Sequence, residues 1–161
     1  PPVVLEGTDF CLSQTPAIMQ YLGNIHGYTT QSPKRDASAL QILLDVCDIG
    51  SELFTIGGDD AKKDAFVAAD GRLSKWFAHL SGVLGKSNGR YLMDDFLLPC
   101  DFALCSCLRS LDFCLGAERV AALYPDNEIK KWREKIQKLP FYEKYLAQAK
   151  PTLFESFKYK A

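Results

Sequence analysis

The pattern of apolar and polar positions at the start of the chain predicts a β-hairpin. Two short runs of β-favouring residues, Pro2–Leu5 and Phe10–Leu12, stand on either side of the tetrapeptide Glu6-Gly7-Thr8-Asp9. Glycine and aspartate are turn-forming residues, and a turn between two strand-like runs is typical of a hairpin. We therefore expect two paired strands before residue 14.

A short helix is predicted directly after the second strand. Thr15 is a good N-cap residue, and Pro16 suits the first helical position, where its missing N–H costs nothing. The N–H groups and the dipole at this helix start favour a bound carboxylate or phosphate, and Gln14 adds an amide at the same place. Ile18, Tyr21 and Leu22 give this helix one apolar face. Gly23 can end it.

A long helix with two apolar faces is predicted next. Residues 24–32 are polar and turn-rich and indicate a linker, after which Pro33 begins the helix with Ser32 as its cap. A helix that is apolar on two sides must be buried on two sides. We expect the two faces to be buried in the core of a helical bundle. A partner subunit or the cleft between two domains is the alternative cover for one of them. The two faces are Leu40, Leu43, Leu44, Cys47 and Phe54, and Ile42, Val46, Ile49 and Leu53.

The rest of the chain is predicted to be helical. We expect helices at residues 61–84, 98–113, 127–138 and 140–149. The expected fold is mostly α, with residues 1–26 as one unit and residues 33–161 as an all-helical domain. A strand inside residues 61–113 would contradict it. The expected buried stripe of residues 61–84 is Phe66, Ala69, Leu73, Trp76, Phe77, Leu80 and Leu84.

Composition narrows the possible functions. The 161 residues suit one ordinary domain, or a small complete domain joined to part of another, and 47% hydrophobic residues suffice for a packed core. A net charge of −1 gives no electrostatic reason to expect nucleic acid or an anionic membrane as partner. No apolar run is long enough for a membrane span. Because the chain starts at Pro1-Pro2, we expect residues before it in the natural protein.

Cysteine and histidine are the residues that could indicate metal or redox chemistry. The cysteines form no C-x-x-C pair, and four of them lie on one expected helix and its exit, which does not suit tetrahedral zinc. We therefore expect no metal, and free, mostly buried thiols in the reducing cytoplasm. The isolated His26 and His79 are expected near the surface. The cysteines are Cys11, Cys47, Cys100, Cys105, Cys107 and Cys114.

The order of these motifs resembles the glutathione transferase family. The family's thioredoxin-like domain ends with a proline-led strand, a hairpin, and a Gln/Glu-Ser/Thr pair opening a helix of the form A-I-x-x-Y-L. The resemblance implies a partial thioredoxin-like ββα unit followed by an all-helical C-terminal-type bundle, and it covers essentially the whole chain. The matching segments are Pro2–Glu6, Gln14-Thr15, Ala17–Gly23, Tyr91–Leu104, and Tyr124-Pro125 through Trp132 to Leu139-Pro140-Phe141.

One helix start departs from the family's pattern. The family's cap there is serine or threonine, whereas Leu98 has no side-chain oxygen. Half of the reciprocal capping box is therefore lost, although Asp101 can still accept from the Leu98 N–H. Leu97 and Phe102 keep the hydrophobic staple. We expect Asp101, Leu97 and Phe102 to be structural residues, with no catalytic role for Asp101.

The resemblance implies a glutathione site, with glutathione as co-substrate and its thiolate as the nucleophile. The family's activating Tyr, Ser or Cys precedes the proline-led strand, so no residue here is assigned a catalytic role. Pro2 resembles the family's cis-proline, and Pro1 cannot donate an amide hydrogen bond. The chain alone is therefore expected to bind glutathione weakly and not to turn it over. The implied binding residues are Gln14, Thr15, Pro2, Val3, Asp48 and Glu52; a solvated helix face also explains the last two.

Two functions of different classes follow from the resemblance. In the first, the full-length protein is a cytoplasmic transferase that conjugates glutathione to apolar electrophiles in detoxification, as a homodimer. In the second, the fold is a non-catalytic dimerisation or docking module in a larger assembly. A preceding segment with Tyr, Ser or Cys at the end of its first strand would favour the enzyme. Both predict that the strand at Val3–Leu5 has an unpaired edge, because its partner strand precedes the chain.

Overall fold

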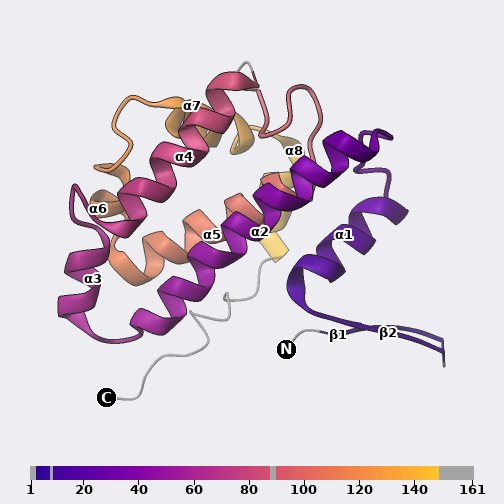
Figure 1. The fold of residues 1–161 in the computed structure, drawn as a ribbon, viewed down its shortest axis with the longest axis horizontal. Helices are drawn as coiled ribbons and strands as arrows, with labels where there is room; N and C mark the ends of the chain where they lie inside the picture. Colours follow the sequence, from indigo (N-terminus) through magenta and orange to yellow (C-terminus); the bar gives the residue numbers. More distant parts are fainter. Residues whose placement is uncertain (1–2, 8, 88–89, 149–161) are drawn as a thin grey trace.

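The computed structural model describes residues 3–7, 9–87 and 90–148 of the chain. These residues form one antiparallel hairpin and eight helices, which confirms the predicted mostly α fold of a small ββα unit followed by a helical bundle (Figure 1). The elements are β1 (Val3–Glu6), β2 (Phe10–Ser13), α1 (Thr15–Ile25), α2 (Pro33–Ile56), α3 (Asp60–Phe66), α4 (Arg72–Lys86), α5 (Pro99–Leu115), α6 (Ala117–Ala121), α7 (Glu128–Ile136) and α8 (Pro140–Gln148).

The hairpin is paired in a simple register. Val3 lies opposite Ser13, and Glu6 lies opposite Phe10. The sheet contains only β1 and β2 within the described residues, so no third strand covers the outer edge of β1 there. Pro1 and Pro2, and with them the expected cis-proline, lie outside the described residues.

The helices pack around α2 and α5, which lie side by side through the centre of the bundle. In Figure 1, α2 runs between α4 and α1, and α7 packs against α4. The core lies between α2, α4, α5 and α7, where burial of each large apolar side chain contributes about 1.5–3 kcal/mol relative to exposure. Its fully buried residues include Leu43, Ile49, Phe77, Leu84, Leu104, Leu111 and Trp132.

Only one of the two apolar faces of α2 is fully buried. Ile42, Val46 and Ile49 lie in the core, as one of the predicted faces requires. On the other face Leu44 is 46% exposed and Phe54 is 62% exposed. Within this chain the described residues cover one face of α2, and the cover expected for the other face, a partner subunit or a domain cleft, stays a prediction. This second face borders a cavity, described below.

The predicted single helix at residues 61–84 is wrong. The chain forms two helices there, α3 and α4, which Gly71 separates. A Cβ atom at Gly71 would lie 2.6 Å from the carbonyl oxygen of Ala65 and 2.7 Å from that of Phe66. The chain can therefore turn tightly after α3 only because this residue is glycine. Ala69, expected in the buried stripe, lies in the break and is exposed.

A buried carboxylate organises the start of α5. The Leu98 N–H donates to Oδ2 of Asp101 over 3.1 Å, and the Leu92 N–H donates to Oδ1 over 3.0 Å. Leu97 packs against the core, and the Phe102 ring lies edge-on to the rings of Tyr28 and Phe141, 5.1 Å away in each case. These contacts tie α5 to the linker after α1 and to α8.

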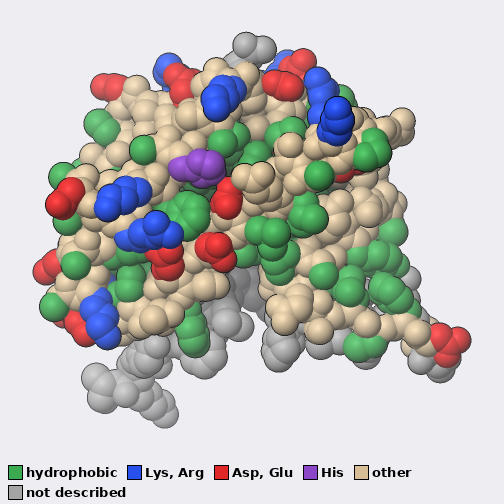
Figure 2. All heavy atoms as spheres, viewed as in Figure 1, with side chains coloured by type: hydrophobic (Ala, Val, Ile, Leu, Met, Phe, Trp, Pro, Cys, Tyr) green, Lys and Arg blue, Asp and Glu red, His purple; other side chains and the backbone are tan. Residues whose placement is uncertain are grey.

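The face of the molecule seen in Figure 2 differs in character from one side to the other. Figure 2 shows charged side chains of both signs over α3 and α4, and mostly hydrophobic or uncharged groups over α1. On the predicted apolar face of α1, Ile18 is buried whereas Leu22 is 38% exposed, so this face is only partly covered. None of the helices in the described ranges has the length and apolar character needed to cross a bilayer.

Candidate functional site

The site begins where β2 passes into α1. Gln14 has a φ of 77° and a ψ of 115°, a conformation that L residues rarely adopt, and it holds the N-cap position. Thr15 is the first helical residue, so the prediction of Thr15 as the N-cap is wrong by one position. The Gln14 side chain makes no capping hydrogen bond, whereas its carbonyl accepts from the Ile18 N–H over 3.0 Å. The Gln14 amide is therefore not used to cap α1.

Gly23 has a different role from the predicted one. The helix continues past it to Ile25, so it does not end α1. A Cβ atom at Gly23 would lie 2.5 Å from Cγ of Pro99, the first residue of α5. The missing side chain lets α1 approach α5 closely. This contact fixes the C-terminal end of α1 against the start of α5.

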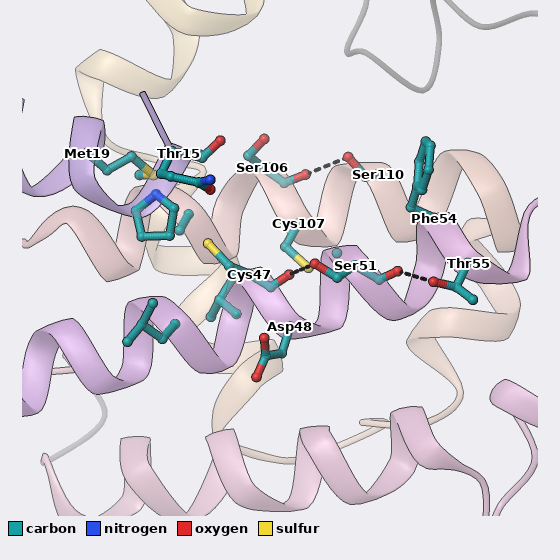
Figure 3. Close-up of a pocket in the computed structure, with 16 residues that line it drawn as sticks. Thr15, Met19, Cys47, Asp48, Ser51, Phe54, Thr55, Ser106, Cys107 and Ser110 are labelled. Carbon is teal, nitrogen blue, oxygen red and sulfur yellow. Dashed lines mark hydrogen bonds between the residues drawn. The ribbon is translucent and has the colours of Figure 1, made fainter. Parts of the chain in front are cut away.

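A cavity of about 840 Å³ opens between the start of α1 and the helices α2 and α5. Thr15 lies on its α1 side (Figure 3), and Gln14, the residue before it, also lines the cavity. Its lining residues are Gln14, Thr15, Pro16, Met19, Leu44, Val46, Cys47, Asp48, Gly50, Ser51, Phe54, Thr55, Ala103, Ser106, Cys107 and Ser110.

Small hydroxyl residues form much of the wall. Ser51 Oγ donates to the Cys47 carbonyl over 3.0 Å, and Thr55 Oγ1 donates to the Ser51 carbonyl over 2.9 Å. On α5, Ser110 Oγ donates to the Ser106 carbonyl over 3.1 Å. Each of these three hydroxyl protons is thus directed at its own helix (Figure 3).

Two thiols complete the wall. Burial raises the pKa of Cys107 to about 12, with a smaller contribution from Cys47. Burial, followed by the charge of Asp48, also raises the pKa of Cys47. Both groups are therefore protonated at neutral pH, and a protonated thiol is a poor nucleophile. None of the six cysteines forms a disulfide bond in the part of the chain that the structure describes.

The two acids predicted on α2 have different surroundings. Asp48 lines the cavity, but Figure 3 shows its carboxylate pointing away from Thr15, to the other side of α2. Glu52 is not a lining residue; its carboxylate forms an ion pair with Arg72 of α4, with Nε–O distances of 3.0 and 3.2 Å. The structure brings Gln14, Thr15 and Asp48 to one cavity and leaves Glu52 outside it.

Val3, which the sequence also assigned to the glutathione site, lies in β1 opposite Ser13 of β2. Sequence reasoning missed the small polar residues of the wall as a group. Their signal was Cys47, Ser51 and Thr55 at four-residue spacing on a helix that also carries apolar stripes. Among the described residues, no cluster of His, Cys, Asp or Glu has the geometry of a metal site.

Comparison with known proteins identifies relatives of this fold. The family model for the C-terminal domain of glutathione S-transferase matches residues 49–149. The structure of a Pi-class glutathione S-transferase from Onchocerca volvulus is similar, with a TM-score of 0.72 and 18% identity over 86% of this chain, which spans 66% of that protein. The structure of NaGST-2 has a TM-score of 0.72 and 22% identity, covering 94% of this chain and 75% of that protein. No curated protein matches the sequence.

Proposed function

The chain belongs to the glutathione S-transferase family, and on that premise we propose that the full-length protein conjugates glutathione to an apolar electrophile. Gln14 and Thr15 bind the γ-glutamyl end of glutathione, and the cavity between α2 and α5 holds the electrophile. The observation that carries the proposal is that the start of α1 and the central helices line one cavity. A nucleophile and its target must be held within reach of each other for efficient reaction, and a shared cavity allows this.

The start of α1 suits a carboxylate. The backbone N–H groups of Thr15 and Ala17 belong to the first turn of an 11-residue helix, whose dipole favours negative charge at that end. Pro16 has no N–H and competes for no acceptor. The Thr15 side chain is exposed, and the Gln14 amide adds donors and an acceptor for the neighbouring amine and carboxylate.

The chemistry is thiol addition or substitution. The glutathione thiol loses its proton, and the thiolate sulfur forms a bond to the electrophilic carbon. In an addition, a π bond of the electrophile breaks and its electron pair takes up a proton; in a substitution, the bond to the leaving group breaks and that group departs with the electron pair. We assign the proton acceptor to no residue of this sequence. Cys47 and Cys107 are unsuited to the role of thiolate because burial raises the pKa of each. We propose two domains: residues 1–26 belong to the glutathione-binding domain, and residues 33–161 form the helical domain.

We also propose a homodimer built on the outer surface of α1 and α2. Leu44 is 46% exposed there, and a shallow, mostly apolar groove passes between Pro16, Tyr21 and Leu44. Large apolar side chains grouped on one face are typical of an interface. Sedimentation of the chain with and without Leu44→Glu tests this, with Leu146→Glu on the exposed part of α8 as control. A monomer at all concentrations would contradict the dimer.

Calorimetric titration with glutathione tests the binding site. We expect weak binding by the 161-residue chain and a further loss of more than about tenfold in Thr15→Ala, since a hydrogen bond to a charged group contributes about 1.5–3 kcal/mol. Thr29→Ala in the linker after α1 is the matched control and leaves the affinity unchanged. Equal glutathione affinity of the wild type and Thr15→Ala would show that glutathione does not bind at this site. Absence of binding also by the full-length protein would favour the non-catalytic docking module.

A further inference from the structure

A second cavity, of about 190 Å³, lies between α5, α7 and α8. It shares no described lining residue with the cavity at the start of α1. The α5 residues that line the two cavities are offset by two positions, about half a helical turn, so the cavities lie on opposite faces of α5. The first face is Ala103, Ser106, Cys107 and Ser110, and the second is Cys105, Leu108, Arg109 and Asp112.

Arg133 of α7, which lines the second cavity, uses only part of its guanidinium group within the protein. Nη1 and Nη2 donate to the Asp112 carboxylate, and Nη1 also donates to the Tyr124 hydroxyl over 2.5 Å. A guanidinium has five N–H bonds, so Nε–H and the second N–H of Nη2 have no partner among the described residues. These two N–H groups lie along one edge of the planar group, and such an edge matches a carboxylate bidentately.

The second cavity is positively charged. Among its described lining residues, Arg109 and Arg133 are the two cations and Asp112 is the one acid, which leaves a net charge of +1. Cys105 is a neutral thiol at pH 7 because burial raises its pKa to about 12. The half-buried Arg109 donates to the Tyr145 hydroxyl of α8 over 3.3 Å, which holds its charge beside α8. A carboxylate would neutralise the cavity, whereas a cation would add a second uncompensated charge.

The rest of the lining suits one aromatic ring. Leu108 and Trp132 are buried, and Tyr142 is half-buried. The indole N–H of Trp132 donates to Asp101, so Trp132 has no donor left for a ligand and offers carbon surface. A cavity of about 150 Å³ in another protein holds benzene, so one of about 190 Å³ accommodates a single ring with a small substituent.

We propose that the cavity between α5, α7 and α8 binds a carboxylate carried on a single aromatic ring. The carboxylate accepts from Nε and Nη2 of Arg133 and is attracted by the charge of Arg109. The ring lies against Leu108 and Trp132. This site goes beyond the proposed function, because glutathione and the electrophile are assigned to the cavity on the opposite face of α5.

NMR titration of the 161-residue chain at about pH 7 tests the site with three single-ring probes. Benzoate is the anion, benzamide has the same ring without a charge, and benzylamine is a cation. The chain has two tryptophans, and of these Trp132 lines the cavity whereas Trp76 of α4 does not. We expect benzoate to shift the indole N–H signal of Trp132 and leave that of Trp76, which Trp76→Phe identifies. Benzoate should bind more than about tenfold tighter than benzamide, the value of a hydrogen bond to a charged group, and benzylamine should bind weakest.

Variants of the two arginines test which groups hold the carboxylate. Arg133→Lys keeps the charge beside Asp112 but loses the planar edge, so benzoate affinity should fall about tenfold while benzamide affinity stays. Arg109→Gln keeps the edge and removes the second charge; it should weaken benzoate about twofold to fivefold, and it tests the site even where Arg133→Lys does not fold. Arg119→Gln is the matched control, because Arg119 pairs with Asp64 over 2.6 Å and is not a lining residue. The control keeps the full preference for benzoate.

The outcomes separate this site from the glutathione site. Equal affinities for benzoate and benzamide, a shift of the Trp76 signal in place of that of Trp132, or a preference that survives both arginine substitutions overturns the inference. Inorganic phosphate binding tighter than benzoate also overturns it, because the ring would then contribute nothing. Benzoate binding that is lost in Thr15→Ala or is displaced by glutathione overturns it as well, since the anion would lie at the start of α1. An unchanged preference in Thr15→Ala supports the site, whatever the glutathione affinity.

Discussion

The indole Nε1 of Trp132 donates a hydrogen bond to Oδ1 of Asp101 over 3.0 Å, across 31 residues of sequence. Both side chains are fully buried. The backbone N–H groups of Leu92 and Leu98 donate to the same carboxylate. Asp101 therefore joins the segment before α5, the start of α5 and the middle of α7 at one point.

Removal of this carboxylate should destabilise the fold strongly. In Asp101→Ala, three buried N–H donors lose their acceptor, and we expect a loss of about 3–5 kcal/mol in the free energy of unfolding. Urea unfolding followed by circular dichroism measures it. Glu134→Ala, an exposed acid on α7, is the control and should change the free energy by less than about 0.5 kcal/mol. Similar losses in both variants would contradict the role given to Asp101.

Asp101 should also make stability depend on pH. Burial raises the pKa of its carboxyl from 3.8 to about 6 in the folded protein, against the effect of its hydrogen bonds. The folded state thus holds the proton more tightly than the unfolded state. The resulting stabilisation is full below about pH 4 and is lost as the pH rises to about 6, up to about 3 kcal/mol at 1.36 kcal/mol per pKa unit.

The variant Asp101→Asn isolates this effect because its amide does not titrate. As the pH rises from about 4 to 6, the unfolding free energy of the wild type should fall by the stated amount relative to that of Asp101→Asn. Parallel curves would show that the carboxyl keeps an ordinary pKa in the folded state.

Gly23→Ala should loosen α1 from the bundle. Its Cβ would meet Cγ of Pro99 at 2.5 Å, so the helices must move apart, at a cost of about 1–3 kcal/mol. Gly85→Ala is the matched control on α4, where a Cβ meets nothing within 4 Å, and it should stabilise the helix by about 0.5–1 kcal/mol. Chemical unfolding of both variants gives the comparison. A gain in stability for Gly23→Ala would show that the contact is loose.

Gln14→Gly should separate stability from binding. Glycine adopts the φ of 77° without strain, so we expect the variant to be about 1 kcal/mol more stable. The proposed glutathione site loses the Gln14 amide, so calorimetry should show weaker glutathione binding. Gln20→Gly, within α1, is the control and should cost about 1 kcal/mol. A destabilised Gln14→Gly would mean that the side chain supports the fold.

Periodicity and local chemistry were enough to predict much of the fold. The hairpin, the long helix from Pro33 and the helix beginning near Pro99 follow from alternation, helical spacing and proline position, which are properties of neighbouring residues. The order of the motifs also pointed to the glutathione transferase family, which the match over residues 49–149 supports. Breaks that depend on packing were missed. The need for glycine at position 71, between α3 and α4, is visible only in the folded structure, where carbonyl oxygens of residues 65 and 66 lie close to it. The short α6, which begins after Gly116 at a φ of 90°, was missed as well.

The sequence by itself determined the hairpin, the long helix from Pro33, the helix beginning near Pro99 and the position of Gln14 and Thr15 at a helix start. Tertiary structure alone decided which side chains share a cavity. Two acids four residues apart on α2 were equivalent in the sequence, yet Glu52 pairs with Arg72 of α4 whereas Asp48 borders the cavity. The physical reason is that a helix face is fixed by local spacing, while its environment depends on which helix packs against that face.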